Sequence, residues 1–436
     1  MKAIDRSGRG LMALSLALAL LLAGCSGTPA PVSSASPSET TSSYTSLNTS
    51  ETTGTTTQTT NSILTQGTST TRIKTTVPVK TTAAPTKAPT APPTKAPTES
   101  APPTASGAKG KNILLTYISD GKVSKEAFRA SVGYIKNGKI TDTLFESILL
   151  LPQPNFLYNY GDSDGGLAPH TKVVWQRYID QMEFGSSLDA LNEAAGEVKA
   201  ATGKKDYKVE VYMSLFPPVK SVTNFGEVNG KNLNFSVPAD RLAAVKWMID
   251  EQIAKFKAKN YQHLKIGGFY WFPESINVAS EKDLIQSVND YIRSLNYQSM
   301  WIPYYKAEGF SDADTLKFDM AFMQANYFPG TDAPNAGGIE RIESAAMLTK
   351  RRGMGLCLEL SSATKEVAIS GFKEYMKFGC NPDVGFMDRN AAYYMGGGAP
   401  LVQDLCESRN AYARSAYDEL YQFIKDTLVK ANVSIR

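Results

Sequence analysis

Histidine is the scarcest catalytic residue type in this chain of 436 residues, which contains only His170 and His263. Zinc hydrolases normally bind their metal through two or three histidines, and a serine hydrolase triad needs one beside its nucleophile. The chain contains no His-Glu-x-x-His, Gly-x-Ser-x-Gly or Gly-x-Gly-x-x-Gly motif. We therefore expect no metal and no cofactor. Because His263 precedes a predicted strand, we expect it away from a site at the strand ends.

Cysteine is also rare, with only Cys25, Cys357, Cys380 and Cys406. The three that follow Cys25 allow at most one disulfide. Cys357 lies within an apolar run and is predicted to be a small buried hydrophobic residue. The sequence leaves open whether Cys380 and Cys406 form a disulfide. None of the three lies in a pattern typical of a catalytic thiol.

The first 25 residues have the pattern of an export signal. Basic residues at positions 2, 6 and 9 precede an apolar run over residues 11–22, which is too short to span a membrane. The motif Leu22-Ala-Gly-Cys25 resembles the lipobox of bacterial lipoproteins, which implies that Cys25 becomes a lipid-modified N-terminus. We expect an extracellular, cell-surface protein attached to the bacterial membrane by this lipid only. The alternative is an ordinary signal peptide with an incidental cysteine.

Residues 26–110 consist almost entirely of threonine, serine, proline, alanine and lysine, and have few apolar residues. Such a composition cannot offset the entropy of folding and predicts disorder. The segment would reach between about 50 Å as a coil and about 250 Å when extended. We interpret it as a disordered tether that carries a folded domain away from the membrane, and whether it is glycosylated stays open.

Residues 111–436 have the composition of one folded domain. Of the 46 basic and 42 acidic residues of the chain, nine and four precede residue 111, which leaves 37 and 38. The domain is therefore nearly neutral, and the basic character of the chain comes from the signal and the tether. Nothing here is typical of a nucleic-acid-binding protein, and we expect a monomer.

Eight apolar, strand-like runs alternate with helical patterns in this domain. Continuous apolar runs are typical of parallel strands that are buried on both faces. The clearest helical pattern covers residues 240–259, and Ser280 is predicted to cap the helix that follows it. Eightfold alternation over this length predicts an α/β fold, a (β/α)₈ TIM-type barrel. The predicted strands are residues 112–118, 147–151, 208–216, 264–272, 299–305, 318–327, 354–360 and 384–388.

Two glutamates lie at the ends of the fourth and seventh predicted strands, Glu274 and Glu359. Glycosidic bond cleavage needs two carboxyl groups, one to donate a proton and one to attack or to activate water. The aromatic residues before Glu274 would raise its pKa, as a general acid/base requires. The side chain of Glu359 should point away from those of its leucine neighbours, and we assign it as the nucleophile.

Other readings of these carboxylates stay open. Glu274 could be a turn residue after Pro273, and Glu359 could be a structural carboxylate paired with a buried arginine or lysine. Asp388, at the end of the eighth predicted strand, is the reserve candidate.

Aromatic and amide side chains gather at six of the predicted strand ends. Sugars offer hydroxyl groups to amides and carboxylates, and flat C–H faces to aromatic rings. For any single aromatic residue the alternative is packing in the core. The predicted sugar-binding residues are Asp120, Asn155, Tyr158, Tyr270, Trp271, Trp301, Tyr304, Tyr305, Gln324, Asn326, Tyr327, Asp388 and Tyr394.

The positions of the two glutamates, at strands four and seven, resemble those of retaining (β/α)₈ glycosidases. The sequence departs from that pattern because the acid/base glutamate there usually follows an asparagine, whereas Pro273 precedes Glu274.

Residues 111–432 more closely resemble a bacterial exported family known as domain of unknown function 4855. That resemblance implies a glycosidase-like barrel and no particular substrate. It rests on Gly268-Phe-Tyr-Trp271 with Glu274, Trp301-Ile-Pro-Tyr-Tyr305, Gln324-Ala-Asn-Tyr327, and Gly353-Met-Gly355 with Glu359.

The sequence thus predicts a surface-anchored glycoside hydrolase that cleaves a polysaccharide or oligosaccharide through two carboxylates, by a retaining mechanism. A noncatalytic glycan-binding lipoprotein on the same scaffold is the alternative. A solute-binding lipoprotein would need two lobes, which the even eightfold alternation disfavours. The sugar, the linkage, the choice between endo and exo cleavage, the choice between retention and inversion, and whether the site is catalytically active stay open.

Overall fold

The structure is a computed structural model that describes residues 110–118, 122–153, 171–332 and 336–428. The predicted signal peptide, its Cys25 and nearly all of the tether lie outside these residues. The same holds for three predicted sugar-binding residues, Asp120, Asn155 and Tyr158, and for His170.

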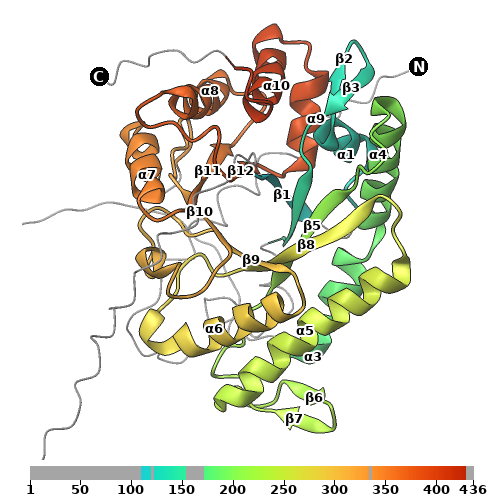
Figure 1. The fold of residues 1–436 in the computed structure, drawn as a ribbon, viewed down its shortest axis with the longest axis vertical. Helices are drawn as coiled ribbons and strands as arrows, with labels where there is room; N and C mark the ends of the chain where they lie inside the picture. Colours follow the sequence, from blue (N-terminus) through green and yellow to red (C-terminus); the bar gives the residue numbers. More distant parts are fainter. Residues whose placement is uncertain (1–109, 119–121, 154–170, 333–335, 429–436) are drawn as a thin grey trace, which may run out of the picture. The chain divides into compact units, whose positions relative to one another are not determined.

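Eight parallel strands form a closed barrel (Figure 1). Each strand pairs with the next along the chain, and the first strand also pairs with the last, from Asn112 beside Ala391 to Leu115 beside Tyr394. The barrel predicted from the sequence is therefore confirmed, and a two-lobed architecture is excluded for the described domain. The strands are β1 (Asn112–Ile118), β4 (Ser147–Pro152), β5 (Val209–Leu215), β8 (Leu264–Trp271), β9 (Gln298–Trp301), β10 (Met320–Gln324), β11 (Gly355–Leu360) and β12 (Ala391–Met395).

The prediction of the eighth strand was wrong. Residues 384–388 form turns, and the last strand is β12, which begins at Ala391. The apolar side chains of this run pack against the last helix of the domain, where the ring centroids of Phe386 and Phe423 lie 6.2 Å apart. Asp388 therefore precedes a strand and lies at the end of the barrel where the strands begin.

Helices surround the barrel in Figure 1. Two short antiparallel hairpins lie outside the barrel sheet. They are β2 (Gly133–Lys136) with β3 (Lys139–Thr143), and β6 (Gly226–Val228) with β7 (Lys231–Leu233). No described helix is long and apolar enough to cross a membrane. The helices are α1 (Lys125–Val132), α3 (Lys172–Arg177), the π-helix η1 (Tyr178–Glu183), α4 (Ser186–Thr202), α5 (Pro238–Lys259), α6 (Val278–Ser294), the 3₁₀-helix η2 (Phe310–Asp312), α7 (Glu340–Lys350), α8 (Glu366–Cys380), α9 (Ala399–Glu407) and α10 (Ala411–Ile424).

Local chemistry explains where these helices begin. Helix α5 starts with Pro238, whose fixed φ and missing N–H suit the first turn. Helix α6 begins earlier than predicted, because Asn277 caps it and accepts the N–H of Ser280 through its side chain. Another asparagine, Asn410, caps α10 and separates it from α9, where the sequence pattern is that of one long helix.

The three cysteines of the described domain are buried and form no disulfide. The possible bridge between Cys380 and Cys406, which the sequence left open, is therefore not formed in this structure. The sulfur of Cys380 instead lies 3.5 Å from that of Met387. The burial of Cys357 within β11 is confirmed.

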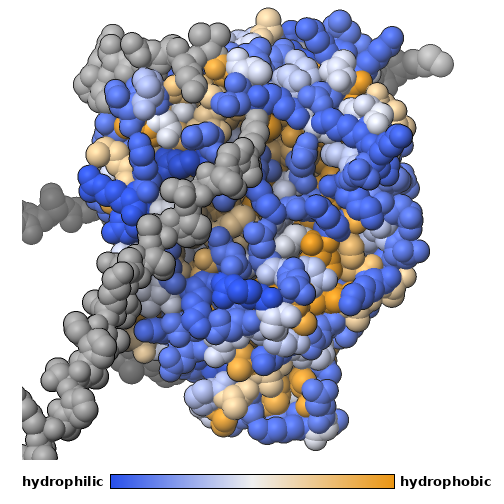
Figure 2. Space-filling model, in the orientation of Figure 1, coloured by the Kyte–Doolittle hydropathy of each residue, from blue (hydrophilic) through white to orange (hydrophobic). Residues whose placement is uncertain are grey.

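The surface shown in Figure 2 is mainly hydrophilic, with apolar residues in small separate groups. Most large apolar side chains are used in the core, either inside the barrel or between the barrel and its helices. This distribution fits the ordinary composition and the near-neutral charge of the domain.

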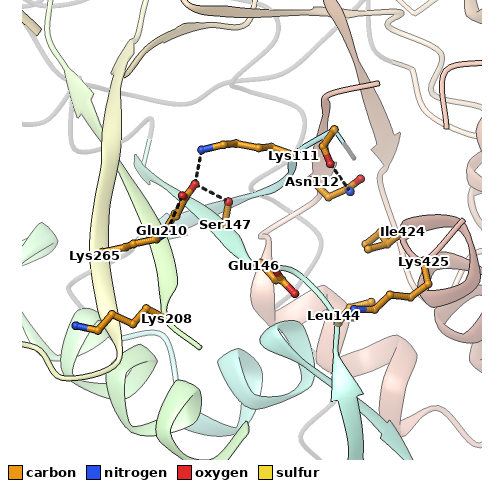
Figure 3. Close-up of a pocket in the computed structure, with 11 residues that line it drawn as sticks. Lys111, Asn112, Leu144, Glu146, Ser147, Lys208, Glu210, Lys265, Ile424 and Lys425 are labelled. Atoms are coloured by element: carbon orange, nitrogen blue, oxygen red, sulfur yellow. Dashed lines mark hydrogen bonds and ion pairs between the residues drawn. The ribbon is translucent and has the colours of Figure 1, made fainter. Parts of the chain in front are cut away.

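An ionic network closes the end of the barrel where the strands begin (Figure 3). A cavity of about 280 Å³ lies there. The Glu210 carboxylate accepts hydrogen bonds from Lys111 at 2.6 Å and from Ser147 at 3.3 Å, and it pairs with Lys265 at 3.1 Å. Lys111 is further fixed by Gln298, 2.8 Å away. Each group in this network has a partner, so its role is structural.

Candidate active site

Glu359 lies in β11 with its side chain inside the barrel. Cys357, two residues earlier on the same face of the strand, belongs to the interior cluster. The Glu359 side chain is 2% exposed, and its Oε2 accepts hydrogen bonds from the Tyr375 hydroxyl at 2.5 Å and from the Tyr327 N–H at 3.4 Å. Its Oε1 is buried and has no partner among the described residues. Since no arginine or lysine of the described domain pairs with it, Glu359 is not the structural ion-pair carboxylate that the sequence left open.

Glu274 follows β8 by three residues and is half-buried. Its Oε1 accepts a hydrogen bond of 2.8 Å from the side-chain amide of Gln324. The backbone here is held to β9 and the loop after it. Trp301 Nε1 donates to the Pro273 carbonyl at 2.7 Å, and the Tyr304 N–H donates to the Glu274 carbonyl at 3.4 Å. Gln324 of β10 thus holds the carboxyl, and β9 with its loop holds the backbone, which a simple turn residue would not need.

One segment at the end of β10 contacts both carboxyls. Gln324 binds Glu274, and the backbone of Tyr327 binds Glu359. Between them Asn326 donates to Gln324 Oε1 at 3.3 Å, and its own oxygen accepts the Tyr305 N–H at 2.8 Å. Asn326 has a left-handed φ of 52°, which asparagine adopts more readily than most residues. The segment therefore positions both carboxyls together.

Burial controls the charge state of this pair. It raises the pKa of Glu274 to about 7, against a hydrogen bond from Gln324 that lowers it. It raises the pKa of Glu359 to about 8, against hydrogen bonds from Tyr375 and from the backbone of Tyr327 and Asn326. The negative charge of Glu274 further opposes ionisation of Glu359. The pair therefore retains a proton near neutral pH, and the titration belongs to both groups together.

Three tyrosines line the barrel beside the carboxyls: Tyr117, Tyr270 and Tyr394. The rings of Tyr117 and Tyr394 meet edge to face at 6.4 Å. Burial raises the pKa of Tyr117 and of Tyr270, and the charge of Glu274 adds to this. The phenols therefore stay neutral hydrogen-bonding groups, of the kind that sugar hydroxyls need.

Sequence reasoning missed Tyr117 and Tyr375. Tyr117 continues the inward series of Ile113 and Leu115 along β1, so strand alternation carried the signal. Tyr375 lies on α8, outside the barrel, and no strand-end pattern in the sequence points to it.

Several predicted sugar-binding residues have other positions. Trp301 is fully buried and stacks on Phe318 at 5.5 Å, and Trp271 is buried in the outer core, so both predictions of sugar contact were wrong. Asp388 is exposed at the opposite end of the barrel, which corrects its assignment as reserve carboxylate. Gln324, Asn326, Tyr327, Tyr270 and Tyr394 are gathered around the two carboxyls.

Tyr304 and Tyr305 lie at the rim of the barrel, after β9. Tyr304 is half-buried, and its N–H contacts the backbone of Glu274. The hydroxyl of Tyr305 donates to Ser344 on α7 at 2.9 Å. The described residues contain no cluster of three or more histidine, cysteine, aspartate or glutamate side chains that could hold a metal ion.

A family model matches residues 112–422 and carries the description domain of unknown function, DUF4855. This chain belongs to the DUF4855 family. No match was found among curated proteins. The family fold in this chain is the TIM-type barrel described above.

Solved structures of other proteins show a distant likeness. A protein provisionally assigned as an alpha-L-fucosidase, from Bacteroides thetaiotaomicron, has 11% identity and a TM-score of 0.40, over 77% of this chain and 99% of that one. A tri-modular GH5 endo-beta-1,4-glucanase from Bacillus licheniformis has 11% identity and a TM-score of 0.37, over 73% and 60%. Methylaspartate ammonia lyase from Clostridium tetanomorphum has 9% identity and a TM-score of 0.37, over 74% and 60%. This likeness concerns the fold alone.

Proposed function

We propose that this chain is a glycoside hydrolase in which Glu274 is the general acid/base and Glu359 the nucleophile. The observation that carries the proposal is the asymmetry of Glu359. Its Oε2 is held by the Tyr375 hydroxyl and the Tyr327 N–H, while its Oε1 is buried and without a partner among the described residues. We assign this oxygen, which the described protein groups leave without a hydrogen bond, as the atom that attacks the substrate.

The hydrogen-bond donors separate the roles of the two carboxyls. Two donors at Glu359 Oε2 stabilise its anion, and the neutral amide of Gln324 is the donor at Glu274. The pKa of Glu359, about 8, is above that of Glu274, about 7, so the shared proton of the free protein rests mainly on Glu359. Our assignment uses the other tautomer, with the proton on Glu274, as the form that reacts when substrate binds. This division matches the needs of acid and nucleophile in glycoside cleavage.

The proposed reaction has two steps. Glu274 donates its proton to the glycosidic oxygen while Glu359 Oε1 attacks the anomeric carbon, so that the glycosidic bond breaks and an ester to Glu359 forms. Glu274, now ionised, takes a proton from water, whose oxygen attacks the anomeric carbon and releases Glu359. Two inversions give retention of configuration.

The segments before the domain complete the proposal. Residues 1–25 would direct export and leave Cys25 as a lipid anchor, and residues 26–110 would form a disordered tether. The enzyme would then work as a monomer at the bacterial cell surface on a polysaccharide or oligosaccharide. Figure 2 shows the mainly hydrophilic surface that such a location suits.

The test is release of reducing ends from a panel of polysaccharides. Glu359→Gln should lower the rate by about 10³-fold or more, since a nucleophile is removed, while binding of the same polysaccharide persists. Proton NMR of the first product formed should show the anomeric configuration of the substrate. Binding without hydrolysis in the unaltered protein would instead favour the noncatalytic glycan-binding alternative.

A further inference from the structure

Two cations meet on one aromatic ring at the rim of the barrel beside Glu274. Lys306 Nζ lies 5.1 Å from the centroid of the Tyr305 ring, and the guanidinium carbon of Arg341 lies 4.8 Å from it. These distances bound the separation of the two charges at about 10 Å, close to one Debye length at physiological salt. Both charges therefore contribute to the positive potential at this rim.

Backbone hydrogen bonds connect the cations to the catalytic carboxyl. The Tyr304 N–H donates to the Glu274 carbonyl at 3.4 Å, and the Tyr305 N–H donates to Asn326 Oδ1 at 2.8 Å. The carbonyl of Asn326 accepts the N–H of Gly337 at 2.8 Å, just before α7, which carries Arg341. The rim is thus built on the same β10 segment that holds Glu274 and Glu359.

Packing fixes the guanidinium of Arg341. A Cβ atom at Gly337 would lie 1.9 Å from Arg341 Nε, so the guanidinium rests directly on the glycine backbone. It also contacts the ring of Tyr305, whose hydroxyl is anchored to Ser344. A long side chain held between a glycine and an anchored ring presents its charge at a defined place.

Lys306 is accessible to a ligand at this rim. It is exposed, and its φ of 56° is left-handed, which costs a non-glycine residue free energy. It forms no ion pair with a carboxylate of the described residues. Among nearby acids, Glu308 binds Asn277 at 2.8 Å, and Glu340 lies in the first turn of α7, where the helix dipole stabilises it.

We propose that Lys306 and Arg341 bind an anionic group on the substrate, a carboxylate, sulfate or phosphate carried by the glycan. The inference rests on the proposed function, because it assigns a substrate class to the same site. A neutral sugar gains little from two cations on one rim, whereas an anionic substituent forms a charge-assisted hydrogen bond with one of them and is attracted by the other.

The test measures binding by isothermal titration calorimetry in the Glu359→Gln protein, so that hydrolysis does not intervene. The probes are polygalacturonate, dextran sulfate and poly(glycerol phosphate), with dextran as the neutral reference. We expect at least one anionic polymer to bind more tightly than dextran. Lys306→Asn, which tolerates the left-handed backbone, and Arg341→Gln should each weaken that binding by about tenfold.

Lys317→Asn is the matched control. Lys317 is also an exposed lysine with a left-handed φ, 63°, but it precedes β10 and so lies at the other end of the barrel. Its substitution should leave binding unchanged. The inference is overturned if dextran binds as tightly as every anionic polymer, or if Lys317→Asn weakens binding as much as Lys306→Asn.

Failure of this inference and failure of the proposed function give different results. Cation-dependent binding of an anionic polymer, with no hydrolysis by the unaltered protein, would retain the inference and reject the enzyme. Hydrolysis of a neutral glycan that Lys306→Asn leaves unchanged would retain the enzyme and reject the inference.

Discussion

The Tyr375 hydroxyl donates a hydrogen bond of 2.5 Å to Glu359 Oε2 across the wall of the barrel. Tyr375 is fully buried on α8, and its ring lies 6.0 Å from that of Tyr327, whose N–H donates to the same carboxylate. A charge-assisted bond of this kind stabilises the ionised carboxylate and fixes which oxygen faces the substrate. A helix outside the barrel thereby controls a group inside it.

Removal of this hydroxyl should impair both the charge and the orientation of Glu359. For Tyr375→Phe we expect a fall in kcat of about 10- to 100-fold, because the lost donor contributes about 1.5–3 kcal/mol to a charged acceptor. The acidic limb of the pH profile should shift to higher pH, since the anion is less stabilised. A fall in kcat with an unchanged acidic limb would show that Tyr375 has only a packing role, and circular dichroism controls for folding.

The pH profile of kcat/KM should be bell-shaped with a maximum near neutral pH. Burial raises the pKa of Glu274 to about 7 and that of Glu359 to about 8, so the active form holds one proton on the pair. Activity falls at low pH as the nucleophile is protonated and at high pH as the acid loses its proton.

Glu274→Ala separates the two limbs of that profile. With an aryl glycoside whose leaving group needs no proton, the variant should lose the alkaline limb and keep the acidic one. An alkaline limb that persists in this variant would assign the acid to another residue.

Buried Glu183 should make the domain less stable as pH rises. It is fully buried in η1, burial raises its pKa to about 8, and the hydrogen bond from Gln252 opposes this only in part. Above the unfolded pKa of about 4.3 the unfolded state releases this proton while the folded state keeps it. Stability therefore falls between about pH 4.5 and 8.

Glu183→Gln removes that proton linkage. The variant should gain on the order of 2–4 kcal/mol over the unaltered protein at pH 7.5 and little at pH 4.5. Urea unfolding at both values measures the difference. An equal effect at the two pH values would mean that the carboxyl is not protonated in the folded state.

Glu210 should contribute stability without affecting catalysis. Burial opposes its ionisation, but Lys111 and Lys265 outweigh this and lower its pKa. The contribution is therefore present above the unfolded pKa and lost as the pH falls through the lower, folded pKa. Glu210→Gln should cost about 1–2 kcal/mol at pH 7, because the pairs are partly exposed.

Activity measured on the same Glu210→Gln protein is the control. The network lies at the opposite end of the barrel from Glu274, so kcat/KM should not change at a temperature where both proteins are folded. A change in kcat/KM would show that the two ends are coupled.

The barrel and the positions of the two glutamates were predictable because buried parallel strands are apolar runs, and Glu274 and Glu359 end two of these. The last strand was missed because its sequence begins with two alanines and two tyrosines, while the apolar run before it packs on α10. Strand alternation could have corrected Trp301, since its neighbours Met300 and Ile302 face the barrel interior. Tyr375 reaches the site from a helix, and only tertiary structure brings it there.

The short segment at the end of β10 couples the two carboxyls to each other. Gln324 contacts Glu274, and Tyr327, three residues later in the chain, contacts Glu359. A shift of this backbone would therefore change the pKa of Glu274 and the orientation of the Glu359 carboxylate together. A designer who transfers the two glutamates to another barrel must transfer this tetrapeptide with them. Under the proposed mechanism, a substitution in this segment would alter the strength of the acid and the orientation of the nucleophile in one step.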